Sequence, residues 1–129
     1  MRRNFLVIIC CLFLLNCVAE NKPKEITLSN GSRIRIHFEK IEDKEREPIF
    51  SLDCRAEDIK LREDTVEKEV LEIWGLVKKE AEKLELKEAV IQYNFTAGEK
   101  NEDNKLIYHR LLYDASQIEN GDWKIKKVN

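Results

Sequence analysis

Residues that commonly carry enzyme chemistry are scarce in this sequence, apart from carboxylates. Its two histidines, His37 and His109, lie far apart, and neither belongs to a metal-ligand spacing such as H-E-x-x-H. Cys54 has no histidine or cysteine beside it in sequence, which predicts a buried thiol and not a reactive one. The 25 acidic side chains form many chance pairs, so no acid and base can be selected among them.

Larger catalytic and cofactor motifs are absent as well. The 129 residues contain no G-x-S-x-G, no glycine-rich phosphate loop and no C-x-x-C, and they include only four glycines. Two histidines and one cysteine do not complete a zinc site convincingly. The sequence therefore indicates no catalytic residue, no cofactor and no metal ligand, and it leans towards a protein without enzyme activity.

The apolar stretch from Phe5 to Leu15 is 11 residues long and follows Arg2 and Arg3. A transmembrane helix needs about 20 apolar residues, whereas a basic start and a shorter apolar stretch are typical of a secretory signal. The stretch is therefore predicted to be an export signal and not a membrane span. The Arg2-Arg3 pair also echoes a twin-arginine signal, which is a less favoured export route.

Two cleavage sites compete after this apolar stretch. Leu14 and Cys17 resemble the lipobox of bacterial lipoproteins, although Leu15 and Asn16 are larger than the usual residues there, as in the looser spirochaete type. The rival is Cys17-Val18-Ala19, an A-x-A-like site that would release a soluble protein beginning at Glu20. The lipobox is preferred because polar residues soon follow the cysteine, as suits a tether.

The lipobox resemblance implies a three-part organisation and a location. Residues 1–16 are then a signal peptide, residues 17–24 a lipidated tether, and residues 25–129 a single domain. Cys17 is the implied lipid attachment site, carrying diacylglycerol and palmitate. The expected partner is the lipid bilayer of a bacterial cell envelope, at the outer membrane or at the periplasmic face of the inner membrane.

Cleavage before Cys17 also changes the composition of the chain. It discards Cys10 and Cys11, and acylation consumes Cys17, so Cys54 remains as a lone thiol and the domain must rely on a buried core. The remaining 113 residues suffice for one domain. Their 21 basic and 25 acidic side chains argue against a nucleic-acid partner, while an envelope protein partner stays open.

The first part of the domain is predicted to be a hairpin. Two alternating runs between residues 26 and 38 flank Asn30-Gly31. A two-residue loop would mix apolar and polar side chains on each face, so a three-residue loop, residues 29–31, is preferred. That register places Ile26 opposite Ile34.

Further elements follow from the changing period of apolar residues. The charged segment 39–48 is predicted to be a solvated loop, and alternation predicts a strand at 50–54 with Cys54 on its apolar face. Apolar residues at steps of three and four predict an amphipathic helix over Lys60–Lys83, with Asp58 as its cap. The main members of that stripe are Val66, Val70, Ile73, Trp74 and Val77.

Gly75 lies inside the predicted helix, where a glycine costs about 1 kcal/mol relative to alanine. Two structural roles for Gly75 would offset that cost. The preferred one is a close approach of the helix to a sheet, with Trp74 alongside, and the other is the floor of a ligand site.

The second half of the domain returns to strands. Alternation predicts one over residues 89–95, a strand in preference to a helix over 106–113, and a last strand from Trp123 after the turn at 120–122. A polar loop is expected at 96–105. The predicted fold is α+β, an antiparallel β-sheet packed against one long amphipathic helix.

Two resemblances bear on function. The segment 61–92, with "VLEIW" and "EAVIQ", and the closing "NGDWKIKK" resemble small exported bacterial lipoproteins of unknown function, which supply no catalytic residues. This implies a lipid-anchored interaction or structural module. Residues 121–125 also resemble the last strand of nuclear-transport-factor-2-like domains, whose cone-shaped pockets bind small molecules or catalyse reactions.

The second resemblance implies the alternative function, an exported pocket protein or enzyme. The resemblance does not extend to the start of the domain, because those domains begin with helices and this one is predicted to begin with a hairpin. The alternative predicts a cavity lined by four aromatic side chains, Tyr93, Tyr108, Tyr113 and Trp123.

Overall fold

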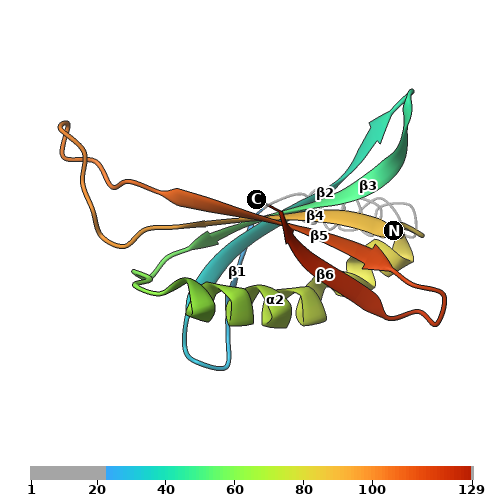
Figure 1. Cartoon of the computed structure of the whole chain (residues 1–129), viewed down its shortest axis with the longest axis horizontal. Helices are drawn as coiled ribbons and strands as arrows, with labels where there is room; N and C mark the ends of the chain where they lie inside the picture. The colour runs from blue at the N-terminus through green and yellow to red at the C-terminus, as the bar shows by residue number, and fades with distance from the viewer. Residues whose placement is uncertain (1–22, 129) are drawn as a thin grey trace, which may run out of the picture.

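The order of strands in the sheet follows their order in the chain. The computed structural model describes residues 23–128, which form a six-stranded sheet and one helix (Figure 1). The elements are β1 (Lys24–Thr27), β2 (Arg33–Asp43), β3 (Arg46–Ala56), α2 (Glu63–Lys83), β4 (Glu88–Phe95), β5 (His109–Gln117) and β6 (Trp123–Val128). The predicted sequence of three strands, a helix and three strands is confirmed, and the fold is α+β.

One strand pair departs from the predicted antiparallel sheet. β3 and β4 are neighbours and run parallel, whereas the other four pairs are antiparallel. The reason is the helix between them. At about 1.5 Å per residue, the 21-residue α2 carries the chain back by roughly 30 Å, so β4 starts near the same end of the sheet as β3.

The β1–β2 hairpin has the predicted register. Ile26 lies opposite Ile34, and the Leu28 N–H donates to the Ser32 carbonyl at 2.8 Å, which leaves residues 29–31 as the loop. Gly31 has a φ of 86°, the left-handed conformation that a three-residue loop requires at this position. The three-residue loop is therefore confirmed.

The predicted loop at residues 39–48 is wrong. β2 and β3 continue as a paired hairpin, with Lys40 opposite Phe50 and Ile41 opposite Ile49. In Figure 1 this hairpin projects from the sheet on the side away from α2. Both faces of such a projection are exposed, so backbone pairing forms it without the alternation of apolar residues that reveals a half-buried strand.

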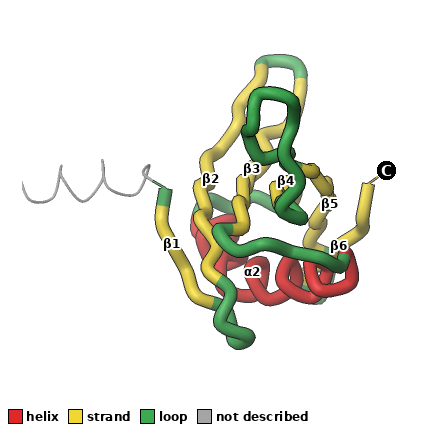
Figure 2. The backbone as a smooth tube through the Cα atoms, turned by 90° about the vertical axis from the view of Figure 1, so that its left-hand side faces the viewer, coloured by secondary structure: helices red, strands yellow, loops and turns green. Residues whose placement is uncertain are grey.

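A hydrophobic core lies on the side of the sheet that faces α2. Figure 2 shows α2 below the strands. The Trp74 ring of α2 lies 6.0 Å from the Phe50 ring of β3 and 4.9 Å from the Trp123 ring of β6, measured between centroids. Alternate residues of the strands supply the rest of the core. The fully buried side chains include Ile34, Phe50, Leu52, Val66, Val70, Ile73, Ile91 and Tyr93.

The helix begins three residues later than predicted. Lys60 is in an extended segment, where its N–H donates to the Thr96 carbonyl at 2.9 Å. The N-terminal flanking residue is Arg62, which provides no side-chain cap. The predicted cap Asp58 instead accepts a 2.9 Å hydrogen bond from the Arg33 N–H, so it fastens β2 and does not cap α2.

Gly75 also differs from both of its predicted roles. It is exposed on the outer side of α2, and a Cβ added there would have no heavy atom within 4 Å outside its own helical surroundings. Neither a close approach to the sheet nor a ligand floor fits this position. We find no contact that offsets the cost of this glycine.

The segment at 106–113 is strand only from His109 onwards. Residues 106–108 belong to the β4–β5 connection, residues 96–108, in which Leu106 forms an isolated bridge with Lys100. This connection projects on the same side as the β2–β3 hairpin (Figure 1). The turn at 120–122 and the final strand from Trp123 are confirmed.

Candidate functional site

The predicted lipid attachment site lies outside the described residues. These begin at Pro23, so the predicted signal peptide and Cys17 are not among them. β1 starts at Lys24, seven residues after Cys17, at an edge of the sheet. No helix among residues 23–128 is long and apolar enough to cross a bilayer.

Cys54 is a core residue of β3, as predicted. Its side chain is 1% exposed on the face that carries Phe50 and Leu52. Burial raises the pKa of the thiol well above its ordinary value, so the reactive thiolate is strongly disfavoured. Cys54 is therefore inert in the folded protein.

The two histidines lie in different surroundings. His109 is exposed, with its Nε2 3.1 Å from Glu99 Oε1, and His37 lies opposite Asp53 on the sheet face away from α2. Across residues 23–128 no group of three or more His, Cys, Asp or Glu side chains is placed to hold a metal ion.

The four aromatic residues of the pocket alternative do not surround one cavity. Tyr93 and Tyr113 are buried core residues, 0% and 3% exposed, and Trp123 packs against Trp74. Tyr108 lies outside the core, where its ring lies against the guanidinium group of Arg55.

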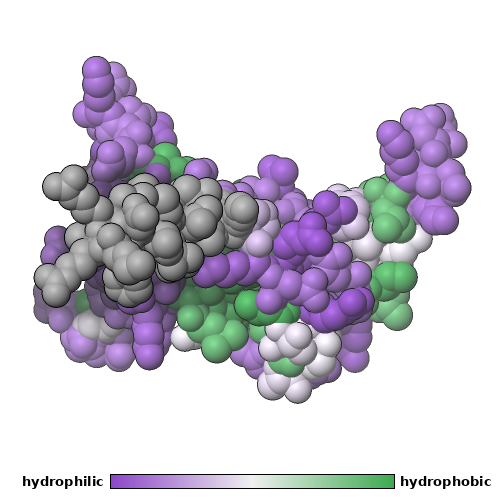
Figure 3. Space-filling view, turned by 180° about the vertical axis from the view of Figure 1, so that it is seen from behind, coloured by the Kyte–Doolittle hydropathy of each residue, from purple (hydrophilic) through white to green (hydrophobic). Residues whose placement is uncertain are grey.

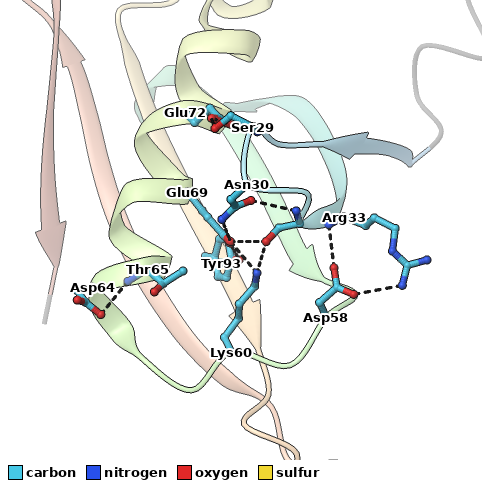
Figure 4. Close-up of polar contacts among 11 residues, drawn as sticks. Ser29, Asn30, Arg33, Asp58, Lys60, Asp64, Thr65, Glu69, Glu72 and Tyr93 are labelled. Carbon is cyan, nitrogen blue, oxygen red and sulfur yellow. Dashed lines mark hydrogen bonds and ion pairs between the residues drawn. The ribbon is translucent and has the colours of Figure 1, made fainter.

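The most highly connected polar group of the described chain is the carboxylate of Glu69, on α2. Its Oε1 lies 2.6 Å from Lys60 Nζ and accepts hydrogen bonds from Ser32 Oγ at 2.7 Å and from Asn30 Nδ2 at 3.1 Å. Its Oε2 accepts from the hydroxyl of Tyr93. Figure 4 shows Asn30, Lys60 and Tyr93 converging on Glu69. Together with Ser32, these residues form what we call the Glu69 network.

The Glu69 network joins four segments of the chain. Asn30 and Ser32 come from the β1–β2 turn, Lys60 from the β3–α2 connection, and Tyr93 from β4 (Figure 4). Lys60 and Glu69 are only 7% and 3% exposed. The network therefore fastens two connections and a strand to the helix.

Electrostatics favour the ionised carboxylate in this network. Burial alone would raise the pKa of Glu69, but the hydrogen bonds from Lys60, Tyr93, Ser32 and Asn30 outweigh it and lower the pKa. Burial and the hydrogen bond to Glu69 raise the pKa of Tyr93, which keeps its hydroxyl protonated as a donor. The Glu69 carboxylate is thus ionised at neutral pH.

A serine beside a lysine could suggest a nucleophile and its base, but the geometry opposes this. A general base must be an uncharged amine, whereas Lys60 is paired with an ionised carboxylate and also donates to Ser32 Oγ. The Ser32 hydroxyl proton is directed at Glu69 and its side chain is buried. The arrangement holds the fold together and offers no accessible nucleophile.

The hollow beside this network is small. It has a volume of about 160 Å³ and includes Ser29 and Glu72, whose carboxylate accepts a 2.9 Å hydrogen bond from the Ser29 N–H. Pockets for drug-sized ligands occupy about 300 to 1,000 Å³. Two larger depressions, of about 490 Å³ beside the end of α2 and about 400 Å³ at the β2–β3 hairpin, are open and lined mainly by exposed charged side chains.

Comparison with known proteins identifies no relatives. No protein-family model matches this chain, and neither a curated protein nor a solved structure matches it.

Sequence reasoning missed the Glu69 network, although one signal was present. Glu69 follows Val66 by three residues and precedes Ile73 by four, so it occupies the apolar stripe of the helix. A carboxylate at such a position needs a buried partner. The partner, Lys60, could not be chosen among the many lysines of the sequence.

Proposed function

We propose that this chain is an exported lipoprotein of a bacterial cell envelope, anchored to a bilayer through acylated Cys17. In this proposal the folded domain acts by binding or as a structural module, without catalysis. The pocket-protein alternative has less support, because its four aromatic side chains do not gather around one cavity.

One observation carries the proposal, the position of Cys17 between the apolar stretch and the domain. Residues 18–24 are seven residues, which span at most about 25 Å when fully extended. The first strand begins at the end of this tether. An anchor at Cys17 would therefore hold the domain close to the membrane surface.

The chemistry of the other cysteines agrees with this assignment. Cys10 and Cys11 lie inside the apolar stretch, and Cys54 is buried in the core. Cys17 is the one cysteine that both follows the apolar stretch and precedes the domain. Two or more acyl chains anchor a protein stably, whereas one chain gives marginal binding.

The proposed module also requires α2 to pack as one layer against the sheet. Seven helix residues are buried, and the Trp74 ring contacts β3 and β6 side chains. A helix with this buried stripe gains most of its stability from such packing and little from propensity. Within residues 23–128, no helix lies on the opposite face of the sheet, and in this proposal that face binds partners.

Metabolic labelling with a palmitate analogue in a bacterial host tests the anchor. We expect label on the wild-type chain and on Cys54→Ser, which is the matched control, and none on Cys17→Ser. Membrane fractionation should show the same pattern. Equal labelling of the wild type and Cys17→Ser, or no labelling of either, would contradict the proposed function.

A further inference from the structure

The face of the sheet opposite α2 carries a row of arginines. The strand register places Arg35 of β2 beside Arg55 of β3, Arg55 beside Asn94 of β4, and Asn94 beside Arg110 of β5. Neighbouring strands are about 4.8 Å apart, so the row extends over roughly 14 Å. We call these four residues the arginine row.

This face is recessed between two projections. The β2–β3 hairpin and the β4–β5 connection both project on the side away from α2 (Figure 1). Seen from behind, their outer ends are mainly hydrophilic (Figure 3). The two projections would hinder the approach of a flat protein or membrane surface. A small molecule or a single headgroup can enter between them.

The cations of the row are only partly neutralised. Arg35 Nε lies 3.2 Å from Glu57 Oε1, but Arg55 and Arg110 form no ion pair with any residue in the described range 23–128. Like charges directly opposite on neighbouring strands are destabilising, and Arg35 faces Arg55 in this way. An anion bound between the guanidinium groups would relieve that repulsion.

Arg55 is held in position by a neutral partner. Its guanidinium carbon lies 4.4 Å from the centroid of the Tyr108 ring, and its Nη2 donates to the Tyr108 hydroxyl at 2.9 Å. A phenol orients the guanidinium without cancelling its charge. Within residues 23–128, the other side-chain N–H groups of Arg55 have no ion-pair partner, and we expect them to contact the ligand.

A hollow of about 140 Å³ lies over the β2 to β4 part of the row, and Arg110 of β5 lies one strand beyond its lining. Its lining includes Arg35, Arg55 and Asn94, together with Asp53 and, from the end of the tether, Pro23. Since one water occupies about 30 Å³ of liquid, the hollow has room for a tetrahedral oxyanion. Guanidinium forks match the paired oxygens of phosphate groups.

We propose that Arg35, Arg55 and Asn94, with Arg110 one strand further along the row, form a binding site for a phosphate group. The source is a soluble phosphate compound or the headgroup of a phospholipid, since both present the same oxygens. The site does not require acylation of Cys17. Failure of lipid labelling would overturn the proposed function and leave this site untouched.

Amide chemical shifts of ¹⁵N-labelled chain test the site. The sample is residues 17–129 with Cys17→Ser, titrated with inorganic phosphate while sodium chloride keeps the ionic strength constant. We expect saturable shifts at Arg55, Asn94 and Arg110. Shifts that chloride alone reproduces, or no shifts in the row, would overturn the proposal.

Single-residue variants distinguish phosphate binding at this site from a general attraction of anions to basic side chains. Arg110→Gln removes a cation that has no partner in the described chain, and it should raise the Kd for phosphate about tenfold, equivalent to about 1.4 kcal/mol. Asp53→Asn removes a carboxylate from the hollow and should lower the Kd. Arg46→Gln, at the far end of β3, is the matched control and should leave the Kd unchanged. Equal Kd values for wild type and Arg110→Gln would contradict the proposal.

Vesicle sedimentation then distinguishes the two sources. The same chain is mixed with phosphatidylcholine vesicles, with or without phosphatidylglycerol. Binding only to the phosphatidylglycerol vesicles, lost in Arg110→Gln, identifies a lipid headgroup. Phosphate binding without vesicle binding identifies a soluble compound. If vesicles bind wild type and Arg110→Gln equally and phosphate shifts no amide in the row, the proposal is overturned.

Discussion

Charged side chains on the two faces of the sheet differ in burial and in pairing. On the helix side, the ammonium of Lys60 and the carboxylate of Glu69 are buried 2.6 Å apart and are surrounded by hydrogen-bond donors. On the open side, Arg55 and Arg110 are exposed, and neither has an ion-pair partner within residues 23–128.

This difference follows from the solvent around each group. A buried charge without a partner costs several kcal/mol, so a charged group on the helix side must be neutralised. Water screens an exposed charge, so an unmatched guanidinium is tolerated on the open side. The buried pair on the helix side therefore stabilises the fold, whereas unpaired guanidinium groups on the open side are available for the binding that we propose.

The largest effect should come from breaking the buried ion pair. Lys60→Met removes the ammonium and leaves the Glu69 carboxylate buried with three remaining donors. We expect the free energy of unfolding to fall by about 3 to 5 kcal/mol, measured by urea denaturation. The double variant Lys60→Met/Glu69→Leu should recover part of this loss, and a further loss of similar size would contradict the pairing.

A smaller loss should follow from shortening a core side chain. Ile73→Ala truncates a residue that is 0% exposed on the helix side and should cost about 2 to 5 kcal/mol. Leu71→Ala, on the exposed side of the same helix, is the matched control and should cost about 0.5 kcal/mol or less. Similar losses for both variants would mean that the helix does not bury this stripe.

Acid should weaken the helix side selectively. The folded pKa of Glu69 is lowered, so the unfolded chain takes up the proton more readily than the folded one. The stabilisation is complete above the ordinary glutamate pKa of about 4.3 and is lost as the pH falls through the lower folded pKa. Urea midpoints should therefore drop in this acid window, with a shallower drop in Glu69→Gln. An equally steep drop in that variant would show that other carboxylates control acid unfolding.

The smallest effect should come from the open side. Arg110→Gln should change the free energy of unfolding by about 0.5 kcal/mol or less, because Arg110 has no ion-pair partner among residues 23–128. Thermal denaturation without phosphate provides the measurement. A loss comparable with that of Ile73→Ala would show that Arg110 supports the fold and would remove the contrast between the faces.

What the sequence could predict depends on burial. Strands with one buried face, such as β3 and β4, show alternation, and the three-residue loop follows from matching the faces of β1 and β2. The exposed β2–β3 hairpin leaves no such pattern. A strand, a helix and a strand of suitable length are compatible with a parallel pair, but alternation alone does not distinguish parallel from antiparallel neighbours.

The polar sites were harder to predict. Lys60 and Glu69 are nine residues apart, one before the helix and one within it, so only the fold brings them together. The arginine row depends on the register of four strands, including the parallel pair that was not predicted. In a chain with 37% charged residues, neither set is distinctive by type alone.

Mass spectrometry of the N-terminal peptide of the mature wild-type chain tests the proposed function most directly. We predict that the chain begins at Cys17, with a diacylglyceryl thioether on its sulfur and a mass increased accordingly. An unmodified N-terminus at Glu20 would contradict the lipid anchor and favour a released protein.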